Sequence, residues 1–178
     1  MKKSLFYFFL CAFAATTWTA CDKDDDLDGG EEEELITTLN VSLTSASGSA
    51  TLNFQDLDGE GGDDGTTTGA TLAANTTYAF STTFLDESES PAEDITEEIQ
   101  EEDDEHFVDY QVSGVTIDVA YGDMDDDGNP LGLVGTITTG DAGTGNFQVI
   151  LRHEPVKTST GATGGSIDID VTFPVTIQ

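Results

Sequence analysis

Ile167-Asp168-Ile169-Asp170-Val171-Thr172-Phe173 is the stretch that decides the fold of this chain. Apolar and polar residues alternate along all of it, which is the period of a β-strand that buries one face. Branched and aromatic side chains also favour strands, because they pack well on a pleated surface. The stretch therefore predicts a strand with Ile167 and Ile169 on the core face and Asp168 and Asp170 on the other.

The same alternation recurs in six other segments, separated by Gly- and Asp-rich breaks that supply turns. These segments are residues 39–44, 52–55, 78–84, 115–121, 131–137 and 147–152. About seven to eight such strands predict a mostly β domain. We expect an antiparallel β-sandwich of Ig-like or similar Greek-key topology.

One segment has helical spacing instead. Ser90 can cap a helix whose first turn holds Pro91. Ala92, Ile95 and Ile99 then fall on one face. The surrounding acids predict one short acidic helix that is favoured at its start and opposed at its end by the helix dipole.

The N-terminus is typical of an exported lipoprotein. Lys2 and Lys3 precede an apolar run over residues 5–15, which is too short to span a bilayer. Thr-Ala-Cys closes this region as a lipobox would, so residues 1–20 are predicted to be a signal peptide and Cys21 to carry the lipid, palmitate among its acyl chains. Two alternatives stay open: an ordinary signal peptide with an incidental Cys21, and an uncleaved anchor.

The residues behind the cysteine indicate the destination. Asp22, Lys23, Asp24, Asp25 and Asp26 resemble the signal that sends some lipoproteins to the outer face of the outer membrane. The alternative is a solvated tether on a periplasm-facing anchor. Residues 21–34 are accordingly assigned to the lipidated cysteine and an acidic tether, and residues 35–178 to the β-sandwich domain.

Charge excludes one class of partner. The formal net charge is -31, and removal of Lys2 and Lys3 with the signal peptide takes it to -33. No basic patch can form, so we expect no nucleic-acid binding and attachment to the membrane through lipid alone. Divalent cations would relieve the self-repulsion of such a chain.

One acidic loop matches the opening of a calcium-binding loop. Asp123, Asp125, Asp127 and Asn129 alternate around Gly128 as D-x-D-x-D-G-N, so their oxygens could converge on calcium. Asp56 and Asp58 could complete this site if both loops lie at one end of the sandwich. The alternative is a plain acidic hairpin turn, because no glutamate occupies the twelfth position.

A second candidate site involves the two histidines. Glu102 and His106 are four residues apart, on a continuation of the helix, and could bind a transition metal together with His153. His153 is in phase with Phe147 and is expected to face the core. The alternative is a helix-terminal histidine and a separate strand-end histidine, each with an ordinary hydrogen bond.

Several short motifs carry a resemblance across most of the domain. They are E-E-L-I-T-T, A-N-T-T-Y, D-I-T-E-E-I, D-x-D-x-D-G-N-P-x-G and L-R-H-E-P. With them the chain resembles a group of small Gram-negative lipoproteins of unknown function, some labelled as having a type 1 periplasmic-binding fold. The resemblance implies no catalytic residue, and that two-lobed α/β fold disagrees with the strand pattern.

The sequence thus predicts a lipid-anchored, non-enzymatic binding or structural module exposed at the outer membrane. The sequence contains no G-x-S-x-G, P-loop or H-E-x-x-H motif that would suggest an enzyme. The alternative is a calcium- or metal-dependent solute-binding lipoprotein that serves uptake, with an envelope protein or a small molecule as partner. A pocket lined by Tyr78, Phe84 or Tyr110, or contact between the two histidines, would favour this alternative.

Overall fold

The computed structural model describes residues 34–59, 62 and 65–178. All of the described residues belong to one compact unit, which begins at residue 32. The predicted lipidation site Cys21 and export signal Asp22–Asp26 lie outside the described residues.

The described residues form two main sheets. The first has the strand order β3 (Thr66–Thr68), β2 (Gly48–Gln55), β1 (Thr38–Ser45), β5 (Thr77–Leu85), β8 (Val134–Thr139) and β7 (Ile117–Tyr121). The second has the order β4 (Ala70–Leu72), β12 (Ser166–Ile177), β9 (Gly143–His153) and β6 (His106–Ser113). A hairpin of β10 (Val156–Thr158) and β11 (Gly161–Thr163) and a helix, α1 (Ile95–Glu101), complete the described fold.

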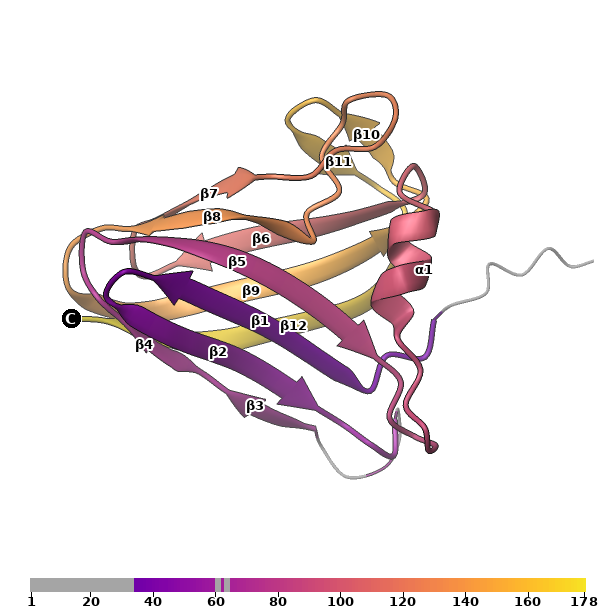
Figure 1. Ribbon diagram of the computed structural model, residues 1–178, viewed down its shortest axis with the longest axis horizontal. Helices are drawn as coiled ribbons and strands as arrows, with labels where there is room; N and C mark the ends of the chain where they lie inside the picture. The colour runs from indigo at the N-terminus through magenta and orange to yellow at the C-terminus, as the bar shows by residue number, and fades with distance from the viewer. Residues whose placement is uncertain (1–33, 60–61, 63–64) are drawn as a thin grey trace, which may run out of the picture. The chain divides into compact units, whose positions relative to one another are not determined.

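The two sheets stack face to face, and α1 stands across one end of the stack (Figure 1). Neighbouring strands are antiparallel, except that β4 runs parallel to β12. The predicted mostly β, antiparallel sandwich with one short acidic helix is therefore confirmed. The chain passes from the first sheet to the second at Gly69, where an added Cβ would lie 1.9 Å from the carbonyl oxygen of Pro174.

The inner faces of both sheets form a filled core. Leu39 and Val41 of β1 and Phe147 and Val149 of β9 are at most 1% exposed. Each such side chain contributes about 1.5–3 kcal/mol by leaving water. Tyr78, Phe84 and Tyr110 belong to this core, and the Tyr110 hydroxyl donates to the Gly132 carbonyl at 2.7 Å. The space among these aromatic residues, where a pocket would have favoured the solute-binding alternative, is thus packed with protein.

The helix differs from its prediction at its start. It begins at Ile95 with Asp94 as its cap, not near Ser90 and Pro91, because Glu93 is held extended by two backbone hydrogen bonds with Asp86. Ile95 and Ile99 are buried as predicted. The helix ends at Glu101, so His106 begins strand β6 and does not continue the helical face.

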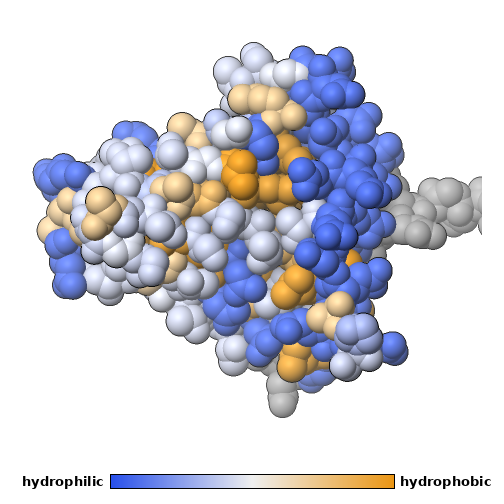
Figure 2. All heavy atoms as spheres, viewed as in Figure 1, coloured by the Kyte–Doolittle hydropathy of each residue, from blue (hydrophilic) through white to orange (hydrophobic). Residues whose placement is uncertain are grey.

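Hydrophilic side chains gather over the α1 end of the sandwich. Figure 2 shows them as an almost continuous band on the face in view. The exposed residues of α1 include Glu97, Glu98 and Glu101. The candidate metal centre lies beneath this end.

Candidate metal centre

Strands β6 and β9 bring the two histidines of the chain together. His106 and His153 are direct cross-strand partners. Their rings stack with centroids 4.8 Å apart and planes at 9°. His106 is 0% exposed and His153 is 8% exposed, so the predicted inward orientation of His153 is confirmed. The expectation that His106 lies on the helix is wrong. The two histidines are in contact, as the metal-site interpretation requires, and the alternative of two separate histidines is wrong.

A β-bulge in β12 brings Asp168 to the histidines. Ile167 pairs with Arg152 and Ile169 pairs with Leu151, so Asp168 is the extra residue between two otherwise consecutive pairs. A bulge re-aims the side chains on one side of it. Ile167 is consequently 49% exposed, although the alternation placed it on the core face. The prediction that Asp168 faces away from the core side is wrong for the same reason.

Glu34 reaches the same place from the segment before β1. Thr37 N–H donates to the Leu85 carbonyl at 3.0 Å, and the Thr37 carbonyl accepts from Asp56 N–H at 2.8 Å, so this segment is tied to neighbouring strands. The Glu34 carboxylate oxygen Oε1 lies 2.8 Å from His106 Nε2, and the Glu34 side chain is 7% exposed. Glu34 was assigned to the tether by sequence, but its side chain is part of the domain.

These four residues form a group that we call the two-His cluster: Glu34, His106, His153 and Asp168. Each offers one ligand atom, and all four atoms lie within 4.8 Å of one another. A second group of Glu105, His153 and Glu154 adjoins it. Among the described residues, no further group of three or more His, Cys, Asp or Glu side chains meets the same distance criterion.

The surroundings of His106 fix the role of each ring nitrogen. Nδ1 lies 3.1 Å from the backbone carbonyl oxygen of Glu102, which can only accept, so Nδ1 carries the proton and donates. Nε2 then faces the Glu34 carboxylate. The predicted ligand Glu102 therefore contributes its backbone to the site, and its side chain lies outside the two-His cluster.

Glu34 and His106 shift each other's pKa. Burial lowers the pKa of His106, but the hydrogen bond and charge of Glu34 outweigh burial and raise this pKa above its ordinary value. Burial likewise raises the pKa of Glu34, but the hydrogen bond and charge of His106, together with smaller contributions, outweigh burial and lower this pKa. Without a metal, the two side chains therefore form a charged, hydrogen-bonded pair.

The predicted calcium residues have other partners. The Asp125 carboxylate accepts from the backbone N–H groups of Asp127 and Asn129 at 3.1 and 2.7 Å, and lies 3.0 Å from Lys157 Nζ. Burial raises the pKa of Asp125, but these hydrogen bonds and the lysine charge lower it overall. Asp123 accepts from three backbone N–H groups, those of Gly132, Leu133 and Val134.

The second acidic loop does not complete that site. Asp56 accepts from Gly59 N–H at 3.2 Å, and Asp58 is exposed. In the described part of the chain, neither carboxylate forms a ligand group with Asp123, Asp125 or Asp127. Residues 123–129 therefore form a hydrogen-bonded acidic turn, in which the Asn129 side-chain amide also donates to Asp125 at 3.2 Å.

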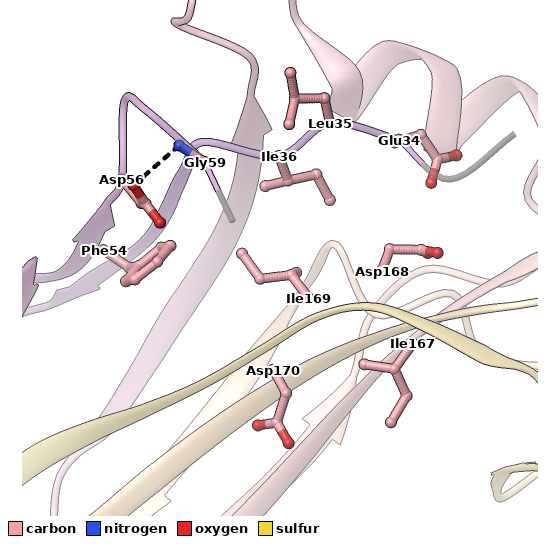
Figure 3. Close-up of a pocket in the computed structure, with 10 residues that line it drawn as sticks. All are labelled: Glu34, Leu35, Ile36, Phe54, Asp56, Gly59, Ile167, Asp168, Ile169 and Asp170. Atoms are coloured by element: carbon pink, nitrogen blue, oxygen red, sulfur yellow. Dashed lines mark hydrogen bonds between the residues drawn. The ribbon is translucent and has the colours of Figure 1, made fainter. Parts of the chain in front are cut away.

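A cavity of about 600 Å³ opens beside the two-His cluster. Figure 3 shows Glu34 and Asp168 on the same side of it, with Ile36 of the segment before β1 opposite Ile169 of β12. Its lining is both apolar and acidic, and comprises Glu34, Leu35, Ile36, Phe54, Asp56, Gly59, Ile167, Asp168, Ile169 and Asp170. Two of the cluster residues are therefore accessible from a pocket that can hold a small solute.

Comparisons with protein-family models, with curated proteins and with solved structures found no match.

Proposed function

We propose that this protein is a lipid-anchored, non-enzymatic binding module of the bacterial cell envelope. The lipobox that ends at Cys21 supports the anchor, and Asp22–Asp26 support export to the outer face of the outer membrane. A periplasm-facing anchor is the alternative location. Among the described residues, no helix is long and apolar enough to cross a membrane.

The observation that carries the binding role is the cavity at the α1 end. It has apolar walls from Leu35, Ile36 and Ile169, and carboxylates that can orient a polar group. The rest of the sandwich interior is packed with side chains that are almost completely buried. Binding is therefore proposed at this end, beside the segment through which the chain enters the domain.

Mass spectrometry of the N-terminal peptide tests the anchor. We expect the membrane-extracted protein to begin at an acylated Cys21, and Cys21→Ser to abolish both acylation and membrane retention. Protease added to intact cells should digest the domain, and replacing Lys23 and Asp24–Asp26 with Ala and Asn should protect it. An unmodified Cys21 would contradict the anchor, and protection of the unaltered protein would favour the periplasm-facing location.

A matched pair of variants tests the pocket. Leu35 lines the cavity and is 53% exposed, whereas Leu57 is 50% exposed and is not among the lining residues. We expect the neutral apolar dye Nile red to gain fluorescence with the unaltered protein and with Leu57→Asp, and to lose it with Leu35→Asp. Equal dye binding by the two variants would contradict the pocket as the binding site.

A second candidate function is metal-dependent solute binding in the service of uptake. The contact between His106 and His153 favours it, because contact between these histidines was one of its two expected signs. The other expected sign, a pocket among the core aromatic residues, is not observed in the described core. The cavity beside the two-His cluster lies at the α1 end instead. A solute that binds in this pocket only when a transition metal is present would support this function over the first.

A further inference from the structure

We propose that the two-His cluster is a binding site for a divalent transition-metal ion of the zinc type. The ligand set is His106 and His153 through ring nitrogens and Glu34 and Asp168 through carboxylate oxygens. The inference goes beyond the envelope-binding role, since it holds with or without a lipid anchor or a solute. The following observations carry it.

The chemistry of the donors selects the metal. Two imidazoles suit zinc, copper, nickel and iron, whereas calcium and magnesium prefer sites made of oxygen alone. Two neutral imidazoles and two carboxylates around a divalent ion give a site with no net charge, which suits a buried position. Four protein ligands are the number that closed zinc sites use.

Buried ligand atoms without partners are a second, independent observation. His153 is 8% exposed, and its Nδ1 is buried without a hydrogen-bond partner among the described residues. The Glu34 side chain is 7% exposed, and its Oε2 is likewise buried and unpartnered within the described residues. Buried polar atoms without partners are unfavourable, and a metal ion would satisfy them.

The outer shell of a metal site is also present. His106 donates Nδ1–H to the Glu102 carbonyl at 3.1 Å, which leaves Nε2 directed at the Glu34 carboxylate. Metal-binding histidines usually donate their second nitrogen in this way, which fixes the tautomer and the ring orientation. The i, i+4 spacing of Glu102 and His106 thus has a role that differs from the predicted pair of ligands.

The distances allow coordination after side-chain rotation. Zinc bonds of about 2.0–2.1 Å place neighbouring ligand atoms of a tetrahedron about 3.3 Å apart. The cluster atoms lie within 4.8 Å of one another, so they converge by at most about 1.5 Å. Glu34 lies before β1 and not within a strand, so rotation of its side chain can provide part of this adjustment.

No lysine or arginine of the described residues supplies the missing cation through a salt bridge to Glu34. Arg152 pairs with Asp109 at 3.6 Å and Lys157 pairs with Asp125 at 3.0 Å. The Asp-rich loop therefore has its own cation, and neither of these two described basic side chains pairs with the Glu34 carboxylate. This arrangement directs an added transition metal to the cluster.

Titration calorimetry of the full-length protein in detergent micelles, with zinc chloride as probe, tests the site. We expect one zinc ion per chain with a dissociation constant in the micromolar range or below. His153→Gln and Glu34→Gln should each weaken binding by at least about 10- to 100-fold. Glu101→Gln is the matched control and should bind zinc as the unaltered protein does, because Glu101 is exposed on α1 and belongs to neither ligand group.

Two further measurements keep the test decisive. Circular dichroism must show that the variants fold. If His153→Gln does not fold, Asp168→Asn takes its place as a ligand variant. Cobalt(II) should give the visible absorption of a four-coordinate ion with the unaltered protein and lose it in the ligand variants. Absence of stoichiometric binding, or equal zinc affinity in Glu34→Gln and Glu101→Gln, would overturn the proposal even if Cys21 is acylated.

Discussion

The Asp-rich loop of residues 123–129 and the two-His cluster are both acidic and both resemble metal sites, but the protein satisfies them differently. In the loop, Asp125 faces Lys157 and the backbone N–H groups of its own turn. In the cluster, two carboxylates face two imidazoles, with buried ligand atoms left over among the described residues. The first is closed by protein groups, and the second remains open to a cation.

The difference teaches that ligand spacing alone does not identify a metal site. The D-x-D-x-D-G pattern does place several carboxylates in one turn, yet backbone N–H donors and a buried lysine already occupy the same oxygens. Lys157 is 5% exposed on its side chain and also donates to the carbonyl of His106 at 2.8 Å. It thus joins the loop to the strand that carries the metal-site histidine.

The largest expected effect comes from removing that lysine. Lys157→Met leaves the Asp125 carboxylate, 2% exposed, without its cation. An uncompensated buried charge should lower the free energy of unfolding by about 3–5 kcal/mol, measured by urea denaturation. Millimolar calcium should then restore part of the stability, because the variant loop has become an open acidic site.

The double variant Lys157→Met, Asp125→Asn serves as the control. It removes both charges, so it should lose less stability than Lys157→Met alone and should not respond to calcium. A calcium response in the unaltered protein equal to that of Lys157→Met would show that the loop was never closed.

The next effect is stabilisation by zinc. A ligand present at one hundred times its dissociation constant stabilises the folded state by about 2.7 kcal/mol. We expect zinc to produce this increase in the unaltered protein and about 1.4 kcal/mol or less in His153→Gln, whose zinc affinity is at least about tenfold lower, as measured by chemical denaturation at fixed free zinc. A zinc effect of equal size in His153→Gln would place the metal elsewhere on the acidic surface.

The pair Glu34 and His106 predicts a pH dependence in the metal-free protein. The pKa of His106 is raised, so its contribution is complete below its ordinary pKa of 6.5 and is lost as pH rises through the raised value. The pKa of Glu34 is lowered, so its contribution is complete above its ordinary pKa of 4.5 and is lost as pH falls through the lowered value. The pair therefore stabilises the folded state most between pH 4.5 and 6.5.

Denaturation of the unaltered protein and of Glu34→Gln, both in chelator, measures this contribution. The difference between them should be about 2 kcal/mol within that window, the worth of a hydrogen bond between charged groups, and should shrink at higher pH. A difference that does not change from pH 5 to pH 9 would contradict the charged pair.

The smallest effect is expected at the tip of the Asp-rich loop. The Asp127 side chain is exposed, and it is the Asp127 backbone N–H that donates to Asp125. Asp127→Asn should change the free energy of unfolding by no more than about 0.5 kcal/mol, with or without calcium. A loss of several kcal/mol that appears only in calcium would restore the loop as a calcium site.

Much of the fold follows from alternation in the sequence. The segments that alternate strictly coincide with β1, β2, β5, β7, β9 and most of β12. Strand β6 could not be predicted from alternation of apolar and polar residues, because His106, Phe107 and Val108 are buried in succession. Phe107 packs on Tyr121 with ring centroids 5.4 Å apart, while its neighbours face the core, so both sides of the strand are covered.

The site could be predicted only in part. His153 is an even number of residues from Phe147, Val149 and Leu151, so alternation along its own strand is enough to place it on the core side. Strict alternation places the Asp168 side chain on the face of the strand away from the histidines, and only the bulge turns it toward them. Nothing in Ile167-Asp168-Ile169 indicates that the bulge falls there. Glu34 meets His106 across 72 positions of sequence, a contact that depends on how the two sheets stack.

Anomalous diffraction from a crystal grown with zinc tests the central claim most directly. Data collected on both sides of the zinc absorption edge locate the ion without any assumption about its ligands. We predict one strong peak among Glu34, His106, His153 and Asp168 and none at residues 123–129. A peak at the Asp-rich loop with none at the two-His cluster, or no ordered zinc at all, would contradict the account.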